Sequence, residues 1–155
     1  MQARMKNPVL VVPGVLEHLL GLGRTAAHSK IPETTLKLVD VRASQINACS
    51  LCLDMHNYEL RKLGESDERL FAIAAWRESP YFNDAERAAL ALTEALTRLN
   101  DREDGVPDAV WQEVARHYDE RALATLVVQI GKINLWNRIN VATRQPANSW
   151  REFVR

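Results

Sequence analysis

The spacing of the apolar residues constrains this chain more than any other feature. Between most of the glycines and prolines, apolar side chains recur every three or four positions, which is the period of an amphipathic helix. No convincing stretch alternates apolar with polar residues, as a half-buried strand requires. The sequence therefore predicts an all-α fold, a helical bundle of about six to seven helices.

Two of the predicted helices precede the cysteines. One runs from about Pro13 to Ala27, and the other begins near Pro32, a residue that suits a first helical turn. The buried stripe expected for the first helix consists of Val15, Leu16, Leu19, Leu20 and Leu22. The stripe expected for the second consists of Leu36, Val39, Ala43 and Ile46. This second helix leads directly to the cysteines.

Cap residues predict where the later helices begin. We expect Asn47 to cap a third helix, which holds the cysteines in its first turns and stops at Gly64. Ser66 is expected to cap a short fourth helix. The remaining starts are a capping box from Asn83 to Glu86, the helix start at Pro107 and the cap Asp119.

Length and charge limit the classes of protein that this chain fits. Its 155 residues suffice for one domain, 1–155, with a core from about 13 to 145. Twenty basic residues balance twenty acidic ones, which removes the electrostatic term that dominates nucleic-acid binding. Charges interrupt every helix, so no membrane span is expected. Because Pro8 and Pro13 break the N-terminal apolar run, which lacks the core of a secretory signal, we expect a cytoplasmic protein.

The chain's only two cysteines, Cys49 and Cys52, lie three positions apart. A disulfide across so short a loop removes little chain entropy, so chemistry explains the pair better than stability does. In a regular helix, His56 shares a face with both cysteines, within an arc of roughly 60°. A helix N-terminus favours a thiolate, and an imidazole one turn further can accept the thiol proton. These three residues therefore predict a reactive dithiol centre.

Other interpretations of the same residues remain open. Buried cysteines often serve only as small hydrophobes. A zinc site would use Cys49, Cys52 and His56 and would need a fourth ligand, from a carboxylate or from His18, His28 or His117. We expect neither a metal nor another cofactor. The four tryptophans, Trp76, Trp111, Trp136 and Trp150, are expected to anchor the core or an interface of a homo-oligomer.

The segment around the cysteines resembles the alkylhydroperoxidase D-like (AhpD-like) branch of the carboxymuconolactone decarboxylase superfamily. The family's diagnostic element is Cys-x-x-Cys-x-x-x-His, and the likeness extends from about Leu36 to Arg144. It rests on Arg42-Ala43-Ser44-Gln45-Ile46-Asn47-Ala48-Cys49-Ser50-Leu51-Cys52-Leu53-Asp54-Met55-His56, Gly64, Arg69-Leu70, Ala75-Trp76-Arg77, Phe82, Ala88, Leu90, Thr93-Glu94-Ala95 and Ile133-Asn134-Leu135-Trp136-Asn137-Arg138.

This resemblance implies an all-helical protomer that assembles into dimers, trimers or hexamers. It also implies a peroxidase that reduces hydrogen peroxide or organic hydroperoxides, with a dithiol or thioredoxin-like protein as the reductant. By analogy, Cys52 attacks the peroxide, Cys49 resolves the sulfenic acid to a disulfide, and His56 relays the proton. The sequence alone leaves open the reverse order, in which the first cysteine attacks as in thioredoxin.

Near this centre the chain departs from the family pattern. Lys37 stands where the best-studied members place a glutamate that begins a proton relay, and Ala48 replaces the usual glycine before the first cysteine. Asp40, about one turn after Lys37, could replace that glutamate or could be a surface partner of Lys37. We therefore add Asp40 to the candidate catalytic residues.

The predicted function is that of an antioxidant thiol peroxidase or disulfide oxidoreductase. An alternative from another class is a non-enzymatic helical oligomer or binding module, in which the cysteine pair senses oxidation. A ring-cleaving decarboxylase is disfavoured, because the true carboxymuconolactone decarboxylases lack the cysteine pair.

Overall fold

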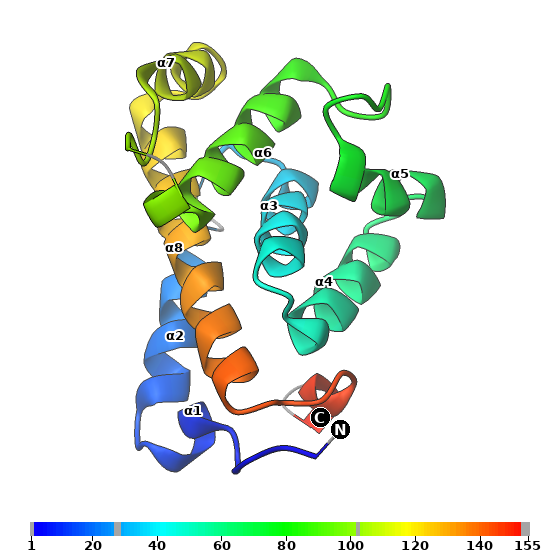
Figure 1. The fold of residues 1–155 in the computed structure, drawn as a ribbon, viewed down its shortest axis with the longest axis vertical. Helices are drawn as coiled ribbons and strands as arrows, with labels where there is room; N and C mark the ends of the chain where they lie inside the picture. The colour runs from blue at the N-terminus through cyan, green and yellow to red at the C-terminus, as the bar shows by residue number, and fades with distance from the viewer. Residues whose placement is uncertain (1, 27–28, 102, 153–155) are drawn as a thin grey trace.

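Every regular element is helical in residues 2–26, 29–101 and 103–152, the part of the chain that the computed structural model describes (Figure 1). The α-helices are α1 (Pro8–Val11), α2 (Val15–Thr25), α3 (Glu33–Ile46), α4 (Ser50–Lys62), α5 (Asp67–Ala72), α6 (Asp84–Thr97), α7 (Asp108–His117) and α8 (Glu120–Ala142). Short 3₁₀ helices follow as η2 (Ile73–Ala75), η3 (Leu99–Asp101) and η4 (Ser149–Glu152). The all-α prediction is confirmed, and the single turn α1 brings these residues one helix above the predicted number.

Most of the predicted caps are present. Ser66 accepts a hydrogen bond from the Arg69 backbone N–H at the start of α5, and Asp119 accepts one from the Ala122 N–H at the start of α8. Asn83 and Glu86 form the full capping box of α6. These side chains satisfy backbone donors that the first turn of a helix leaves unpaired, and so they fix where each helix begins.

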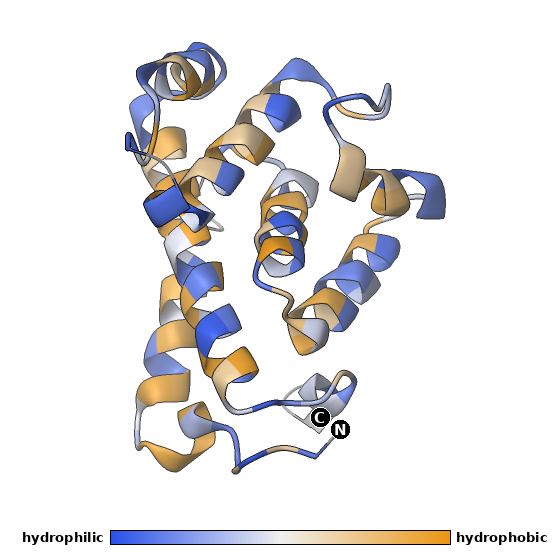
Figure 2. Cartoon of the chain, viewed as in Figure 1, coloured by the Kyte–Doolittle hydropathy of each residue, from blue (hydrophilic) through white to orange (hydrophobic). Residues whose placement is uncertain are grey.

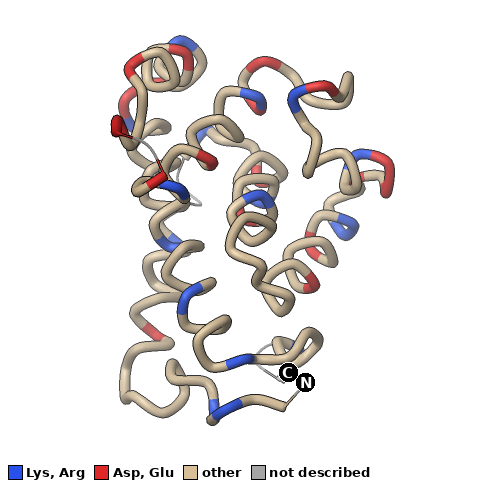
Figure 3. The backbone as a smooth tube through the Cα atoms, in the orientation of Figure 1, with Lys and Arg blue, Asp and Glu red and all other residues tan. Residues whose placement is uncertain are grey.

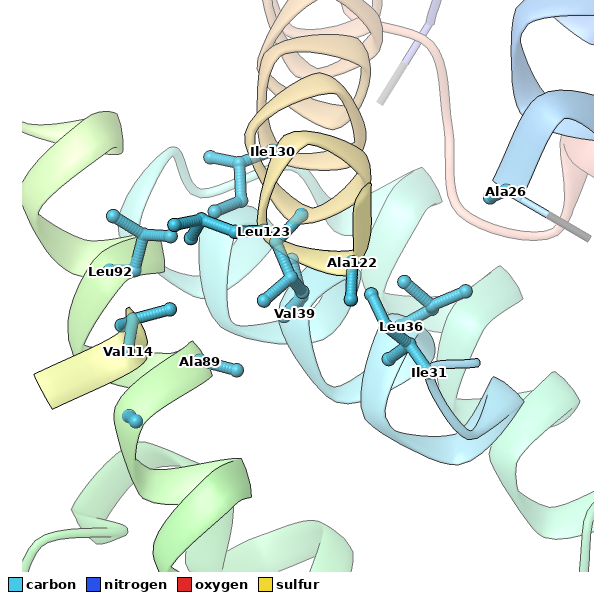
Figure 4. Packing of buried hydrophobic residues seen from close by; sticks show 12 residues of the cluster. Ala26, Ile31, Leu36, Val39, Ala89, Leu92, Val114, Ala122, Leu123 and Ile130 are labelled. Atoms are coloured by element: carbon cyan, nitrogen blue, oxygen red, sulfur yellow. The ribbon is translucent and has the colours of Figure 1, made fainter. Parts of the chain in front are cut away.

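The central helix is α3, which Figure 1 shows between α4, α6 and α8. Leu36 and Val39 pack into a cluster with α6 and α8, whereas Leu38 and Val41 pack into a second cluster with α4, α5 and η2. Figure 4 shows the first cluster, in which Leu92 and Ala89 from α6 meet Leu123 and Ile130 from α8. A helix with several buried faces forms the centre of a bundle, so α3 can place polar side chains where water does not reach.

A buried carboxylate ties three elements together away from the cysteines. Glu94 on α6 is 4% exposed and lies 2.7 Å from the Arg42 guanidinium on α3. It also accepts hydrogen bonds from Trp76 Nε1, at 2.9 Å, and from Arg77. Burial would raise the pKa of Glu94, but these donors outweigh it and lower the pKa. Four residues that carry the family resemblance thus hold the bundle together.

The prediction for α2 was wrong in one respect. The helix lies close to its predicted position, but none of its residues is buried, and Leu20 and Leu22 are 50% and 38% exposed. The helix runs beside α8, and Figure 2 shows hydrophobic residues along it and along α1. The contacts of α2 with α8 and α1 cover its apolar stripe only in part, so several of these side chains stay exposed.

Within the described residues, no helix combines the length and the apolarity that crossing a bilayer requires.

Candidate active site

The turn that carries the cysteines differs from the prediction at its cap. Asn47 is not the N-cap of α4 but the C-cap of α3, and Cys49 itself is the N-cap of α4. Between them Ala48 has φ 53°, a left-handed conformation that glycine adopts without cost and other residues rarely adopt. This conformation explains physically why glycine is usual at the position.

Asn47 has a different role, because it ties the turn to α8. Its side-chain amide donates to Asn134 Oδ1 and Asn137 Oδ1, both at 2.9 Å. Asn137, which is fully buried, donates in turn to Ser44 Oγ at 3.0 Å. The turn before the cysteines is therefore held by side chains that lie about ninety positions later in the sequence.

The two cysteines form a disulfide at the start of α4, with their Cα atoms 5.3 Å apart. Both are buried, at 2% exposure for Cys49 and 1% for Cys52. The Cys52 backbone N–H donates to Cys49 Sγ at 3.3 Å, and Asn140 on α8 donates to Cys52 Sγ at 3.5 Å. Each sulfur thus has a donor that would stabilise a thiolate after reduction.

His56 lies on the same helix, and it is 6% exposed. Its Nδ1 lies 2.7 Å from Glu59 Oε2 and 3.7 Å from Asp40 Oδ2, so two carboxylates face one ring nitrogen. In this disulfide form, no hydrogen bond within the described residues joins His56 to either sulfur. If Glu59 holds the proton on Nδ1, Nε2 is the ring nitrogen left to accept one.

The structure brings Asp40 to His56 and excludes one of its two predicted roles. Asp40 has no exposed surface, so it is not a surface partner of Lys37. Its two carboxylate oxygens accept hydrogen bonds from Gln129 Nε2, at 2.8 and 2.9 Å. Gln129 therefore supplies the polar partner that a buried carboxylate needs.

Lys37 pairs with a different acid, one that the sequence analysis missed. Lys37 Nζ donates to Glu59 Oε2 at 2.8 Å. Burial would raise the pKa of Glu59, but its hydrogen bonds and ion pairs with His56 and Lys37 lower the pKa to about 2. Burial would likewise lower the pKa of Lys37, but Asp40 and Glu59 outweigh it and raise that pKa. Glu59 stands three positions after His56 on the same helix, a spacing that would have revealed it.

Two of the three histidines offered as extra zinc ligands lie elsewhere. His18 is exposed and contacts the Gly14 carbonyl oxygen, and His117 pairs with Glu113 on α7. His28 lies outside the described residues. Among the residues with described positions, no three His, Cys, Asp or Glu side chains are grouped as ligands of one ion would be.

The protein belongs to the carboxymuconolactone decarboxylase family, whose model matches residues 13–95, and to its AhpD-like branch. The chain is 36% identical over 139 residues to the uncharacterized protein YdfG of Bacillus subtilis, covering 90% of this chain and 93% of YdfG.

Solved structures agree with this assignment. A protein of unknown function from Agrobacterium tumefaciens, provisionally named as an antioxidant defence protein AhpD, superposes with a TM-score of 0.86. It is 32% identical, over 94% of this chain and 98% of that one. The debrominase Bmp8, solved with 2,3,4-tribromopyrrole, reaches a TM-score of 0.77 at 20% identity, over 94% of this chain and 76% of its own. At that identity the likeness shows the fold alone. Family membership and the close cysteine pair are consistent with a redox function.

Proposed function

We propose that this protein is a cysteine-dependent peroxidase that reduces hydrogen peroxide or organic hydroperoxides. The observation that carries the proposal is the Cys49–Cys52 disulfide at a helix N-terminus, with a buried histidine one turn further along the helix. This arrangement supplies two sulfurs that can exchange a bond, a helix end that favours a thiolate and an imidazole that can hold a proton.

In the proposed reaction the Cys52 thiolate attacks one peroxide oxygen, and His56 holds the proton that the thiol has released. The O–O bond breaks, an alcohol or water leaves with that proton, and Cys52 becomes a sulfenic acid. The Cys49 thiol then attacks the Cys52 sulfur, forming the disulfide and releasing water. An external dithiol, small or thioredoxin-like, reduces the disulfide and is itself oxidised to a disulfide. Asp40 and Glu59 keep His56 oriented from its Nδ1 side.

Stopped-flow oxidation of the reduced protein by several peroxides, with thiol counting before and after, tests this order of events. Cys52→Ser should abolish peroxide consumption. Cys49→Ser should allow one oxidation and then stop at a sulfenic acid or a mixed disulfide. If Cys49→Ser loses first-turnover reactivity and Cys52→Ser keeps it, the two roles are reversed. If neither change matters, the protein is not a thiol peroxidase.

The histidine gives a separate prediction. His56→Ala should raise the apparent pKa of the reactive thiol and slow the reaction near neutral pH, because the proton acceptor is gone. At alkaline pH, where thiolate forms unaided, the variant should approach the unmodified rate. A uniform loss across the pH range would contradict a role in proton transfer.

The second candidate function is a redox-responsive oligomer without turnover. The exposed apolar residues of α2 favour it, since oxidation at a buried centre could alter how such a surface packs. A steady-state measurement with an external dithiol separates the candidates, because a peroxidase consumes peroxide continuously under these conditions and a sensor without turnover does not.

A further inference from the structure

A cavity of about 340 Å³ lies between the end of α2, the start of α3 and the middle of α8. Its wall includes Gly23, Ala26, Leu36, Lys37, Gln129 and Lys132. Neither cysteine nor His56 lines it, so it is a separate feature from the dithiol centre. Its volume falls at the small end of the range typical for pockets that bind small molecules.

One side of the cavity is apolar. Ala26, Ile31 and Leu36 are all buried, at 9%, 6% and 7% exposure. Figure 4 shows Ile31 and Leu36 close together, with Ala26 at the end of α2 across from them. These side chains offer an aliphatic surface, on which the body of a small organic molecule gains free energy by leaving water.

The other side carries Lys132, a cation that no carboxylate of the described residues pairs with. Lys132 Nζ donates to Gln129 Oε1, a neutral amide, at 2.8 Å. No carboxylate within the described parts of the chain lies within salt-bridge distance of it, whereas Lys37 is paired with Glu59. An added Cβ at Gly23 would lie 3.7 Å from Lys132 Nζ, so the ammonium group lies against the α2 wall of the cavity.

The charge of the lining indicates the charge of the ligand. The lining contains two lysines, Lys37 and Lys132, and one glutamate, Glu33. Because Lys37 is paired with Glu59, Lys132 is the lysine whose charge no carboxylate of the described residues pairs with. Glu33 is exposed at the first turn of α3 and forms no salt bridge within the described residues. A single uncompensated ammonium beside an aliphatic wall fits a monoanion with an apolar body better than it fits a strongly hydrated inorganic anion.

We propose that this cavity binds a small aliphatic carboxylate, with Lys132 as its counterion and with Ala26, Ile31 and Leu36 around its hydrocarbon part. The site adjoins the redox centre, because Gln129 also binds Asp40, which faces His56. The proposal goes beyond the peroxidase function and needs no thiol chemistry, so it can be tested on the oxidised protein, whatever the outcome of the peroxide experiments.

The test is a titration of the oxidised protein with hexanoate, followed by calorimetry and by backbone amide NMR. We expect saturable one-to-one binding in the range of about 0.1–1 mM, as is reasonable for a ligand of this size. The perturbed amides should lie at the end of α2, the start of α3 and the middle of α8. Hexan-1-ol, which has the same tail without the charge, should bind at least about tenfold more weakly.

Three single-charge variants make the test specific. Lys132→Gln should weaken hexanoate binding by about tenfold to a hundredfold, because one charge-assisted contact is lost. Glu33→Gln should tighten binding, because it removes the one acidic group of the lining. Lys6→Gln, an exposed change outside the cavity, should leave it unchanged. An amide spectrum of each variant without ligand verifies that it is folded.

Some results would overturn the proposal. The first is that the unmodified protein shows no saturable binding of hexanoate. The second is that hexanoate and hexan-1-ol bind equally well. The third is that Lys132→Gln and Lys6→Gln bind hexanoate with equal affinity. Amide shifts confined to other helices would also overturn it, and this measurement needs no variant.

Discussion

Two regions of the molecule differ in what they bury. One is the N-terminal arm, formed by α1 and α2, which exposes apolar side chains. The other is the redox centre, formed by Cys49, Cys52, His56 and Asp40, which buries polar ones. The arm leaves Leu10, Val11, Leu20 and Leu22 exposed, and although Val9 on α1 is buried, α2 has no buried residue. The redox centre instead buries a carboxylate and an imidazole, at 0% and 6% exposure. Periodicity therefore shows that a helix has an apolar face, but not whether the same chain covers that face.

Charge is distributed differently in the two regions as well. Figure 3 shows few charged residues on the arm, whereas acidic and basic residues recur along α3 and α4. Several of these side chains connect to one another: Lys37 pairs with Glu59, Glu59 with His56, and Gln129 bridges Lys132 and Asp40. A buried polar group is tolerated only with partners, so the redox centre should be sensitive to changes that the arm accepts.

The largest expected effect is on stability. Asp40→Ala removes the acceptor of both Gln129 hydrogen bonds and leaves a buried amide unpaired, so it should lower the free energy of unfolding by about 3 kcal/mol. Leu20→Ala on the arm should change it by less than about 0.5 kcal/mol in dilute protein, where assembly is absent. Urea denaturation measures both. Equal losses would remove the distinction between the two regions.

The next prediction concerns what covers the arm. We expect a homo-oligomer whose contacts include α2, so Leu20→Glu should raise its dissociation constant by at least about a hundredfold, because a charge would be buried in an apolar interface. Light scattering at micromolar concentrations measures the mass. Phe71→Glu is the matched control, since Phe71 is 75% exposed but lies on α5. The mass of one 17.6 kDa chain at every concentration would refute assembly.

Local signals in the sequence predicted most of the fold. The cap residues Ser66, Asn83 and Asp119 act on backbone groups a few positions away, so their pattern can be read directly and was correct. Asn47 was misassigned because its partners, Asn134 and Asn137, come from a distant helix. Cap statistics describe a residue's neighbours in sequence and do not detect such a competitor.

The candidate site shows the same difference between local spacing, which the sequence reveals, and long-range contacts, which it does not reveal. Cys49 is the N-cap of α4, and Cys52 and His56 lie within that helix, an arrangement that local spacing in the sequence can predict. Gln129 and Asn140 were not found, since a polar residue on the inner face of α8 has no sequence signature of its partner on α3 or α4. Of the two options for Asp40, only tertiary packing could decide between exposure and burial.

A smaller effect concerns access to the disulfide. Trp150 on η4 packs in the cluster that contains both cysteines, and its Nε1 donates to Asp54 Oδ2 at 2.6 Å. Both cysteines are buried, and we expect a reductant to reach them more readily when this contact opens. Asp54→Asn replaces a charge-assisted hydrogen bond with a neutral one, so reduction of the disulfide by dithiothreitol should be about fivefold faster. Asp67→Asn, which changes an exposed ion pair with Arg61, should leave the rate unchanged.

The smallest expected effect concerns Glu59, which links the partly exposed Lys37 to the buried His56. The pKa of Glu59 is about 2 in the folded protein, against an ordinary value of 4.5. A carboxyl group whose pKa is lowered by folding stabilises the protein above the ordinary value, and this stabilisation is lost as the pH falls toward the folded value. Because the Glu59 side chain is 34% exposed, solvent screens the interaction, and we expect a contribution of about 1 kcal/mol.

Glu59→Gln should therefore be less stable than the unmodified protein at pH 6, and the difference should shrink between pH 4.5 and pH 2. Urea denaturation of both proteins across this range measures the difference, and the other carboxylates cancel because both proteins contain them. Glu59 is paired with Lys37 at the surface and with His56 inside. If the difference in free energy of unfolding between the two proteins persists unchanged at pH 2, the contribution of Glu59 to stability comes from packing. A difference that vanishes would assign it to charge, and would identify Glu59 as the ionic link between the exposed and buried parts of the redox centre.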